Sequence, residues 1–577
     1  MMFFLLALAV SVLGVIPLLV GRKPVPALLL GLASTVVLGT IFYLAVPSLA
    51  WPWWGMLGIS VLPLWVTSSV THSFLEDEFQ PTLWFPLVLG GIMLLSTLRG
   101  CEIIMAPEYS ALLGKVEERV WTKDVQPKDP KHMRMASAEN ATRLAMQALG
   151  QEGAIGSQFE ILQSAITPQF IDGKFCLIAP IDFSGWLTWR ATRNIPGYIL
   201  VDGEDPRTPA KFVSLPKDQQ FAYSPGAYWG HNLRRHLWNE GYRDVAFAAY
   251  LLEIDDDHKP WWVVTVYKPT IFASGEKMLG TVLVDPINGK HTFYSMGKIP
   301  QWVDVALPPS FAESYVDWRG LFNGGWWNSW TSRKNVTVGE KPLLVYGSDN
   351  EPYYAIGVTS TSKTDTSLIG LYYVHTRTGK ATFYTAKGST ESAILQAVNK
   401  NEQVQFRHLH GTTPQIYNVY GTMACVVPLL NENHLFQGVA IVNVENVQVM
   451  GVGNDQFEAL RAYQKALPVS GHQIAPELAY ALQRVEGQID RVVVLPQSGA
   501  PTFYLHLEGI PHVFTAGLSL SPEKLPLTQA GDQVSVEYYA SQEAVEPMHA
   551  FDNLSLQLEA TAAETAVRAA GAQSRPE

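Results

Sequence analysis

The amino-acid sequence predicts a multi-domain membrane protein: four N-terminal transmembrane α-helices, then tandem α+β repeats of a helix plus an antiparallel meander, then a small all-β barrel. Three observations lead to this fold class. The first hundred residues are strongly apolar, without a single Asp, Glu, Lys or Arg between Lys23 and Glu76. A hairpin motif then recurs along the chain, and five short strand-like segments follow near its end. The 577 residues leave room for several domains.

The apolar beginning predicts a membrane anchor over residues 1–98, because about 20 apolar residues in a helix cross a bilayer. Arg22 and Lys23 in the first loop favour a cytoplasmic loop, which places the large C-terminal domain outside the cytoplasm, whereas Arg99 argues for the opposite orientation. No predicted span contains a charged residue, so anchoring is a simpler role than ion conduction. We expect a multi-pass protein of the cytoplasmic (inner or cell) membrane, in contact with the lipid bilayer, with spans at residues 3–20, 27–46, 54–70 and 83–98.

The composition of the remaining chain and its lack of known motifs limit the chemistry that it could carry out. The net charge of −11 is spread thinly and gives no basic patch, so no nucleic-acid partner is expected. The three cysteines are far apart and lack the spacing of a zinc site. The motifs of serine hydrolases, phosphate loops, zinc proteases and dinucleotide sites do not occur. We therefore predict no catalytic residue and no cofactor.

Internal repetition is the strongest signal after the anchor. Residues 280–285 (GTVLVD) are followed by residues 289–294 (GKHTFY), and about 90 residues later 370–375 (GLYYVH) are followed by 379–384 (GKATFY). An apolar strand, a glycine turn and an aromatic return strand predict a β-hairpin in each copy.

Each hairpin belongs to a longer unit. Matching strands precede the two hairpins, and weaker copies of the hairpin bring the number of units to four. Helices are predicted between some of them, the first one capped by Ser137. The preceding strands are 259–264 and 351–356, the weaker copies are 197–202 after 175–179 and 438–443 after 425–430, and the helices are 138–149, 232–240 and 391–399.

A helix followed by a meander whose hairpin reads V-D-x-x-x-G-K-x-x-x-Y resembles the PepSY type of domain. The resemblance covers residues 136–467, preceded by a linker over 99–135. It implies small α+β modules, found mostly outside the cytoplasmic membrane, that bind or regulate and are sometimes linked to peptidases or to cell-envelope assembly. It implies no active site.

Five strand-like segments near the end predict a closed barrel over residues 484–557, because closure removes the edges that a lone meander would expose. The barrel resembles an OB-fold. A helical connector over 468–483 precedes it, and an alanine-rich tail over 558–577 is expected to be flexible. The predicted strands are 488–495, 502–507, 512–516, 533–539 and 548–556.

Few residues suggest a site. His408 and His410, two apart on a predicted strand, would point to one face and could share a metal, although a third ligand is not evident nearby. Trp326, Trp327 and Trp330 could bind a partner, a glycan or lipid headgroups, but packing between the second and third units is the favoured interpretation.

Aromatic residues of the barrel, among them Tyr504 and Phe514, could form the face on which OB-folds stack bases. Basic residues are sparse around them, so a protein contact fits better than single-stranded nucleic acid.

We expect a non-enzymatic, membrane-anchored scaffold or binding protein that presents its β-rich domain to other proteins of the cell envelope, with strand addition at exposed edges as the mode of contact. Two alternatives stay open: an accessory subunit of a membrane transport or translocation complex, and a metal-dependent enzyme with a site between repeats. The sequence does not predict the oligomeric state.

Overall fold

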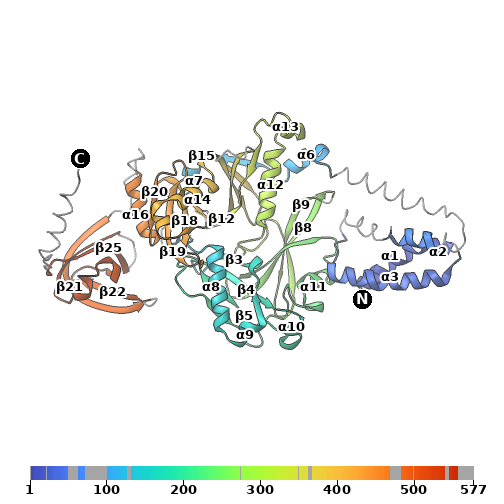
Figure 1. Cartoon of the computed structure of the whole chain (residues 1–577), viewed down its shortest axis with the longest axis horizontal. Coiled ribbons are helices and arrows are strands. Elements are labelled where there is room, and N and C mark those ends of the chain that lie inside the picture. Colours follow the sequence, from blue (N-terminus) through green and yellow to red (C-terminus); the bar gives the residue numbers. More distant parts are fainter. Residues whose placement is uncertain are drawn as a thin grey trace, which may run out of the picture. The chain divides into compact units, whose positions relative to one another are not determined.

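The computed structural model divides the chain into two compact units, Met1–Gln473 and Ile474–Glu577 (Figure 1). The structure describes residues 2–20, 22–49, 61, 63–71, 100–125, 132–272, 274–347, 350–361, 367–467, 482–497, 500–539 and 545–556.

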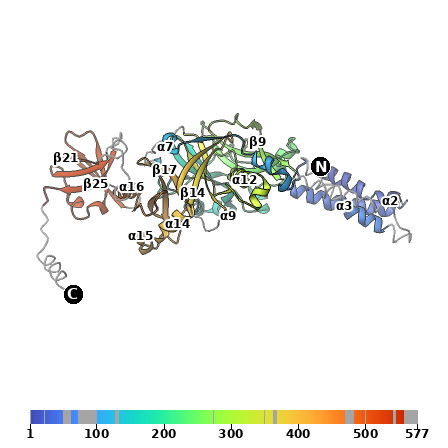
Figure 2. The same ribbon diagram turned by 90° about the horizontal axis from the view of Figure 1, so that it is seen from above.

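The apolar N-terminal part of the first unit forms helices α1 (Met2–Gly14), α2 (Ile16–Val20) and α3 (Pro24–Ala45), with α1 lying along α3 (Figure 1, Figure 2). The 22 residues of α3 extend over about 33 Å, close to the thickness of the hydrocarbon core of a bilayer. Among the described residues, α3 is the one helix that is long and apolar enough to cross a membrane. The prediction of four transmembrane helices, and with it a multi-pass protein, is wrong.

A proline explains why the predicted span 3–20 is not one helix. The chain leaves the helical conformation at Val15, because Pro17 has no backbone N–H to donate to the carbonyl four residues earlier and its ring crowds that carbonyl. Of the predicted span 54–70, the described residues from 63 onward are helical, and the predicted span 83–98 lies outside the described residues. The apolar composition of a segment does not show whether its residues face lipid or pack against another helix.

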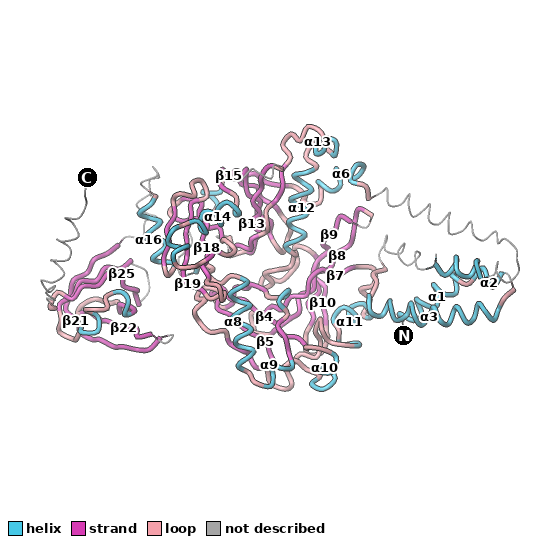
Figure 3. The backbone as a smooth tube through the Cα atoms, viewed as in Figure 1, coloured by secondary structure: helices cyan, strands magenta, loops and turns pink. Residues whose placement is uncertain are grey.

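Four antiparallel meanders form most of the rest of the first unit (Figure 3). Each has four consecutive strands, whereas the similarity between the repeats in the sequence indicated three. The predicted hairpins lie in the last three strands of each meander. The meanders are β3 (Thr167–Ile171), β4 (Lys174–Phe183), β5 (Gly197–Asp202) and β6 (Lys211–Ser214); β7 (Ala246–Ile254), β8 (Pro260–Ile271), β9 (Ser274–Val284) and β10 (His291–Ser295); β12 (Leu343–Tyr346), β13 (Pro352–Ser360), β14 (Ser367–His375) and β15 (Ala381–Ser389); and β17 (Gln415–Val419), β18 (Thr422–Leu430), β19 (Phe436–Asn443) and β20 (Met450–Gly453).

A helix precedes every meander, and we call each helix with its meander a repeat. The four helices are α8 (Ala138–Gln151), α11 (Leu233–Asn239), α12 (Pro309–Leu321) and α14 (Glu391–Lys400). The sequence analysis found all but α12, whose apolar residues are spread around the helix rather than along one face. Further helices are α6 (Glu102–Ser110), α7 (Trp121–Asp124), α9 (Ala154–Gln158), α10 (Trp186–Thr192), α13 (Trp326–Trp330), α15 (Glu402–Phe406) and α16 (Gln456–Ala466).

Short additional strands extend three of the four sheets. They are β2 (Phe159–Ile161) on β4, β11 (Thr337–Gly339) on β13, β16 (His410–Gly411) on β18 and β1 (Val116–Arg119) on β15. The first three precede or lie within the repeat that they extend. β1 instead comes from the region predicted as a linker, and it pairs with β15 in parallel.

Neighbouring repeats share hydrophobic cores, which joins them into one body. Val264 of β8 packs with the first repeat, while Val263, the residue before it, packs with the third. Ile356 and Ala355 of β13 divide in the same way between the second and the fourth repeat. Because successive residues of a strand point to opposite faces, these central strands are apolar on both sides, as their continuous apolar sequences require.

The second unit is a closed five-stranded barrel in the order β21-β22-β23-β25-β24, with β23 and β25 parallel. The prediction of five strands closing into a barrel is confirmed. Phe503, Leu505 and Leu507 alternate into its core. The strands are β21 (Leu482–Gln497), β22 (Ala500–Leu507), β23 (Val513–Gly517), β24 (Gln533–Tyr539) and β25 (Val545–Asn553).

Candidate functional site

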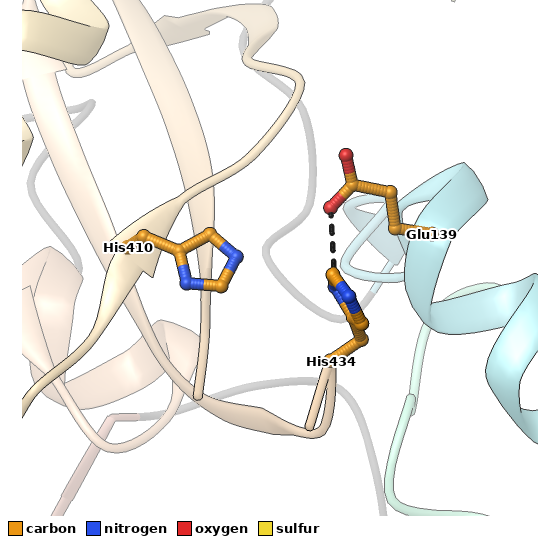
Figure 4. Close-up of side chains that lie close together, drawn as sticks. All are labelled: Glu139, His410 and His434. Carbon is orange, nitrogen blue, oxygen red and sulfur yellow. Dashed lines mark ion pairs between the residues drawn. The ribbon is translucent and has the colours of Figure 1, made fainter. Parts of the chain in front are cut away.

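A cluster of one carboxylate and two imidazoles lies where the first repeat meets the fourth (Figure 4). Glu139 stands in the first turn of α8, whose N-terminus is capped by the Ser137 hydroxyl, which accepts a hydrogen bond from the Asn140 N–H. His410 belongs to β16, and His434 lies in the turn between β18 and β19.

The turn that carries His434 is held by local hydrogen bonds. The Asn431 side chain accepts the N–H groups of Asn433 and Leu435, and His434 has a left-handed backbone (φ 57°). Across the junction of the repeats, the buried Asn140 amide donates to the His434 carbonyl at 3.1 Å. The backbone of His434 is therefore fixed relative to α8.

The ligand atoms of Glu139, His410 and His434 all lie within 4.8 Å of one another. His434 Nδ1 and Glu139 Oε2 lie 3.6 Å apart, and the two imidazole rings meet edge to face with centroids 6.0 Å apart. Two histidines and one carboxylate are a ligand set that binds zinc and leaves one coordination position open.

The predicted pairing of His408 with His410 is wrong. α15 ends at Phe406, and His408 follows in a turn with φ 52°, so the two histidines do not share a strand face. β16 begins only at His410. Two of the three residues of the cluster were missed, because Glu139 and His434 are about 300 residues apart and no local pattern connects them.

The three tryptophans predicted as a partner-binding site, Trp326, Trp327 and Trp330, lie on helix α13. They do not all pack between repeats. Trp326 packs beside α6, against the cluster that contains Ala106 and Tyr109, and it stacks on Trp330 with ring centroids 6.0 Å apart. Trp327 and Trp330 are 64% and 66% exposed. Packing between repeats, the interpretation favoured by the sequence, is therefore wrong for these two indoles.

Of the two aromatic residues predicted at the surface of the barrel, Tyr504 is partly exposed and Phe514 is buried. Phe514 is fully buried in the barrel core and contacts Tyr538 at a centroid distance of 4.9 Å, so it cannot contact a partner. Tyr504 is partly exposed between the inward residues Phe503 and Leu505. Strand alternation decides this difference.

A buried polar group of residues joins the first three repeats, and sequence reasoning missed it. Glu253 accepts the N–H groups of Asp304 and Val305 at 2.7 and 3.1 Å. Asp304 accepts the Phe170 N–H at 2.9 Å and the Tyr346 hydroxyl at 2.7 Å. Burial raises the pKa of both carboxyls, and the neighbouring Asp304 raises that of Glu253 further.

Arg377 supplies the positive charge of this group. Its guanidinium donates to the carbonyls of Gln301 and Val303 and pairs with Glu351. It opposes the effect of burial by lowering the pKa of the Glu253 and Asp304 carboxyls. The sequence does not predict this group, because its Asp, Glu and Arg residues are far apart along the chain and form no local motif.

The edges of the second and third sheets differ although their hairpins match. In the third repeat, β1 covers the outer edge of β15, with Val116 opposite Ala381 and Glu118 opposite Phe383. In the second repeat the sheet ends at β10, and no described strand pairs with its outer edge. The matching sequences make His291 and Phe293 of β10 the counterparts of Ala381 and Phe383.

The hydrogen-bond ladder shows which backbone groups of β10 point outward. The Asp285 N–H donates to the Lys290 carbonyl, and the Met296 N–H donates to the Leu279 carbonyl. Bonded and non-bonded pairs alternate in an antiparallel ladder. The intervening residue Phe293 therefore directs its N–H and carbonyl away from β9.

No known protein-family model matches this chain, and no curated protein matches its sequence. Its class is thus defined by its own fold, which in the part of the chain that the structure describes has one helix able to cross a membrane, four helix-and-meander repeats and a terminal barrel.

Proposed function

We propose that this protein is a membrane-anchored scaffold that binds other cell-envelope proteins by taking up an extended segment of the partner at the outer edge of β10. The observation that carries the proposal is β1: the chain already adds a parallel strand to β15, the counterpart of β10. The resemblance of the hairpin sequences to the PepSY type of domain supports a binding role, as does the strand order of the barrel, which resembles that of an OB-fold.

The joint between α3 and the repeats supports anchoring. The Arg235 guanidinium donates to the Tyr43 carbonyl at 3.2 Å, and the Trp238 indole donates to the Pro47 carbonyl at 2.9 Å. The C-terminal end of α3 is thereby attached to α11. With Arg22 and Lys23 at the other end of α3, the positive-inside rule favours an orientation with the repeats outside the cytoplasm.

Exposed apolar side chains on α6 and α13 support contact with lipid headgroups. Trp327 and Trp330 of α13 lie next to α6, on which Ile103 and Ile104 are 50% and 62% exposed. Indole rings settle at the membrane–water interface, where an apolar ring and a polar N–H are both accommodated. This surface would hold the repeats against the bilayer.

An incoming strand would bond to the outward groups of His291 and Phe293, as β1 does to those of Ala381 and Phe383. The Phe293 side chain is 42% exposed and would lie beside the partner. No intrasheet hydrogen bond would be lost if the Phe293 N–H were removed, because that group faces away from β9.

The test uses this geometry. The purified full chain in detergent selects binders from a library of peptides about ten residues long, and the binders are then measured on two variants. Phe293→Pro removes the outward donor and should weaken binding about tenfold or more, since one lost hydrogen bond is worth about 1.4 kcal/mol. Phe293→Ala keeps the donor and should retain most of the affinity. Equal binding to Phe293→Pro and the parent chain would sink the proposal.

A further inference from the structure

We propose that Glu139, His410 and His434 bind a zinc ion that links the first repeat to the fourth. The three ligands come from α8, β16 and the β18–β19 turn (Figure 4). This inference is independent of the proposed strand-binding edge on β10, which lies in the second repeat.

The chemistry of the ligands favours zinc over calcium. Imidazole nitrogens suit zinc and other late transition metals, whereas calcium takes oxygen ligands. Two imidazoles and one carboxylate leave a fourth position of a tetrahedral ion, which water would fill.

The geometry requires only a small closure. Zinc-to-ligand distances of 2.0–2.1 Å in a tetrahedron place ligand atoms about 3.4 Å apart. Glu139 Oε2 and His434 Nδ1 lie 3.6 Å apart, which is close to this distance, and no two ligand atoms of the cluster are more than 4.8 Å apart. The side chains of Glu139 and His434 are more than half exposed, so rotation about their side-chain bonds can supply the remaining movement of about 1.4 Å.

The backbone positions of the ligands are fixed, which favours binding. His410 is paired with Leu430 of β18, and the next residue, Gly411, donates its N–H to the Asn399 side chain at 2.8 Å. The Asn140 amide holds the His434 carbonyl from the other repeat. Three ligands held in this way lose little backbone freedom when they bind an ion.

The location gives the ion a structural role. The first repeat and the residues just before it already contact the fourth repeat: the Arg134 N–H donates to the Tyr417 hydroxyl at 3.0 Å, and the Arg207 guanidinium lies 5.2 Å from the centre of the Phe436 ring. A zinc ion bound to residues of both repeats would stabilise the contact between the two ends of the repeat series, as a ligand that binds only the folded state does.

The experiment titrates Zn²⁺ into the metal-stripped full chain in detergent, by calorimetry and by metal analysis after dialysis. We expect one zinc per chain, no binding of Ca²⁺, and a higher unfolding temperature with zinc. His434→Ala and Glu139→Gln should each weaken zinc binding more than about 100-fold, because losing a direct ligand exceeds the effect of losing its supporting contacts.

His408→Ala is the matched control, since His408 lies two residues from His410 but outside the cluster. This variant should bind zinc like the parent chain. His434→Cys replaces one zinc ligand by another and should restore binding, which separates ligation from misfolding. Less than stoichiometric zinc in the parent chain, or equal losses in His408→Ala and His434→Ala, would overturn the proposal.

Discussion

The buried charge of Arg377 makes a quantitative prediction about how the first three repeats are held together. Arg377→Met keeps most of the side-chain volume but removes the guanidinium whose charge lowers the pKa of the Glu253 and Asp304 carboxyls. It also removes the donors to the carbonyls of Gln301 and Val303. The buried Glu253 and Asp304 carboxyls then lose the compensating charge of Arg377.

The magnitude follows from the burial of the partners. Removing one member of a buried ion pair costs about 3–5 kcal/mol, because the remaining charge stays in a low dielectric. Burial raises the pKa of Glu253 and of Asp304, and Arg377 opposes this rise. At low pH the Glu253 and Asp304 carboxyls are protonated, and what Arg377→Met then removes is the pair with Glu351 and the hydrogen bonds to the Gln301 and Val303 carbonyls, about 2 kcal/mol. The cost of Arg377→Met should therefore grow with pH.

The assay is urea unfolding of the full chain in detergent, followed by tryptophan fluorescence at pH 5 and pH 8. Lys380→Met is the control, because Lys380 lies in the same hairpin turn and is exposed. We expect Arg377→Met to lower the free energy of unfolding by about 4 kcal/mol at pH 8 and by about half of that at pH 5, with Lys380→Met close to the parent chain. A loss below about 1 kcal/mol, or one that does not change with pH, would refute the reasoning.

Three further predictions concern single elements. Because the pKa of Glu253 is raised by folding, its contribution to stability is complete below the ordinary glutamate value of about 4.3 and is lost as the pH rises through the raised value; unfolding of Glu253→Gln should show a flatter decline with rising pH. Trp238→Ala removes a buried ring that stacks on Phe3 at 4.3 Å and should lower the free energy of unfolding by about 3–5 kcal/mol; unchanged protease cleavage of the α3–α11 joint would contradict this. Replacing Trp327 and Trp330 by Ala should weaken binding of a fragment without α1–α3 to lipid vesicles at least tenfold, measured by flotation, with no effect of Phe293→Ala.

Local patterns account for what the sequence could predict. The hairpins were recognised because Gly289 and Gly379 mark their turns, and both glycines have a left-handed backbone (φ 73° and 67°) that other residues rarely adopt. The barrel strands were recognised from two-residue alternation, which also shows why Phe514 is buried.

Contacts between distant residues could not be predicted in this way. The metal-ligand cluster depends on the approach of the first and fourth repeats, which no single repeat encodes. The number of membrane spans was overestimated because an apolar segment has the same composition whether it faces lipid or packs against another helix. Phe3 and Phe42, for example, pack in one shared core.

Photocross-linking in the native membrane tests the central claim most directly. A photoreactive residue at the exposed position Thr292 reports what lies on the outer edge of β10. Strand addition predicts a cross-link to one extended segment of an envelope protein, lost in Phe293→Pro and kept in Phe293→Ala. No cross-link, or one that survives Phe293→Pro unchanged, would contradict the account.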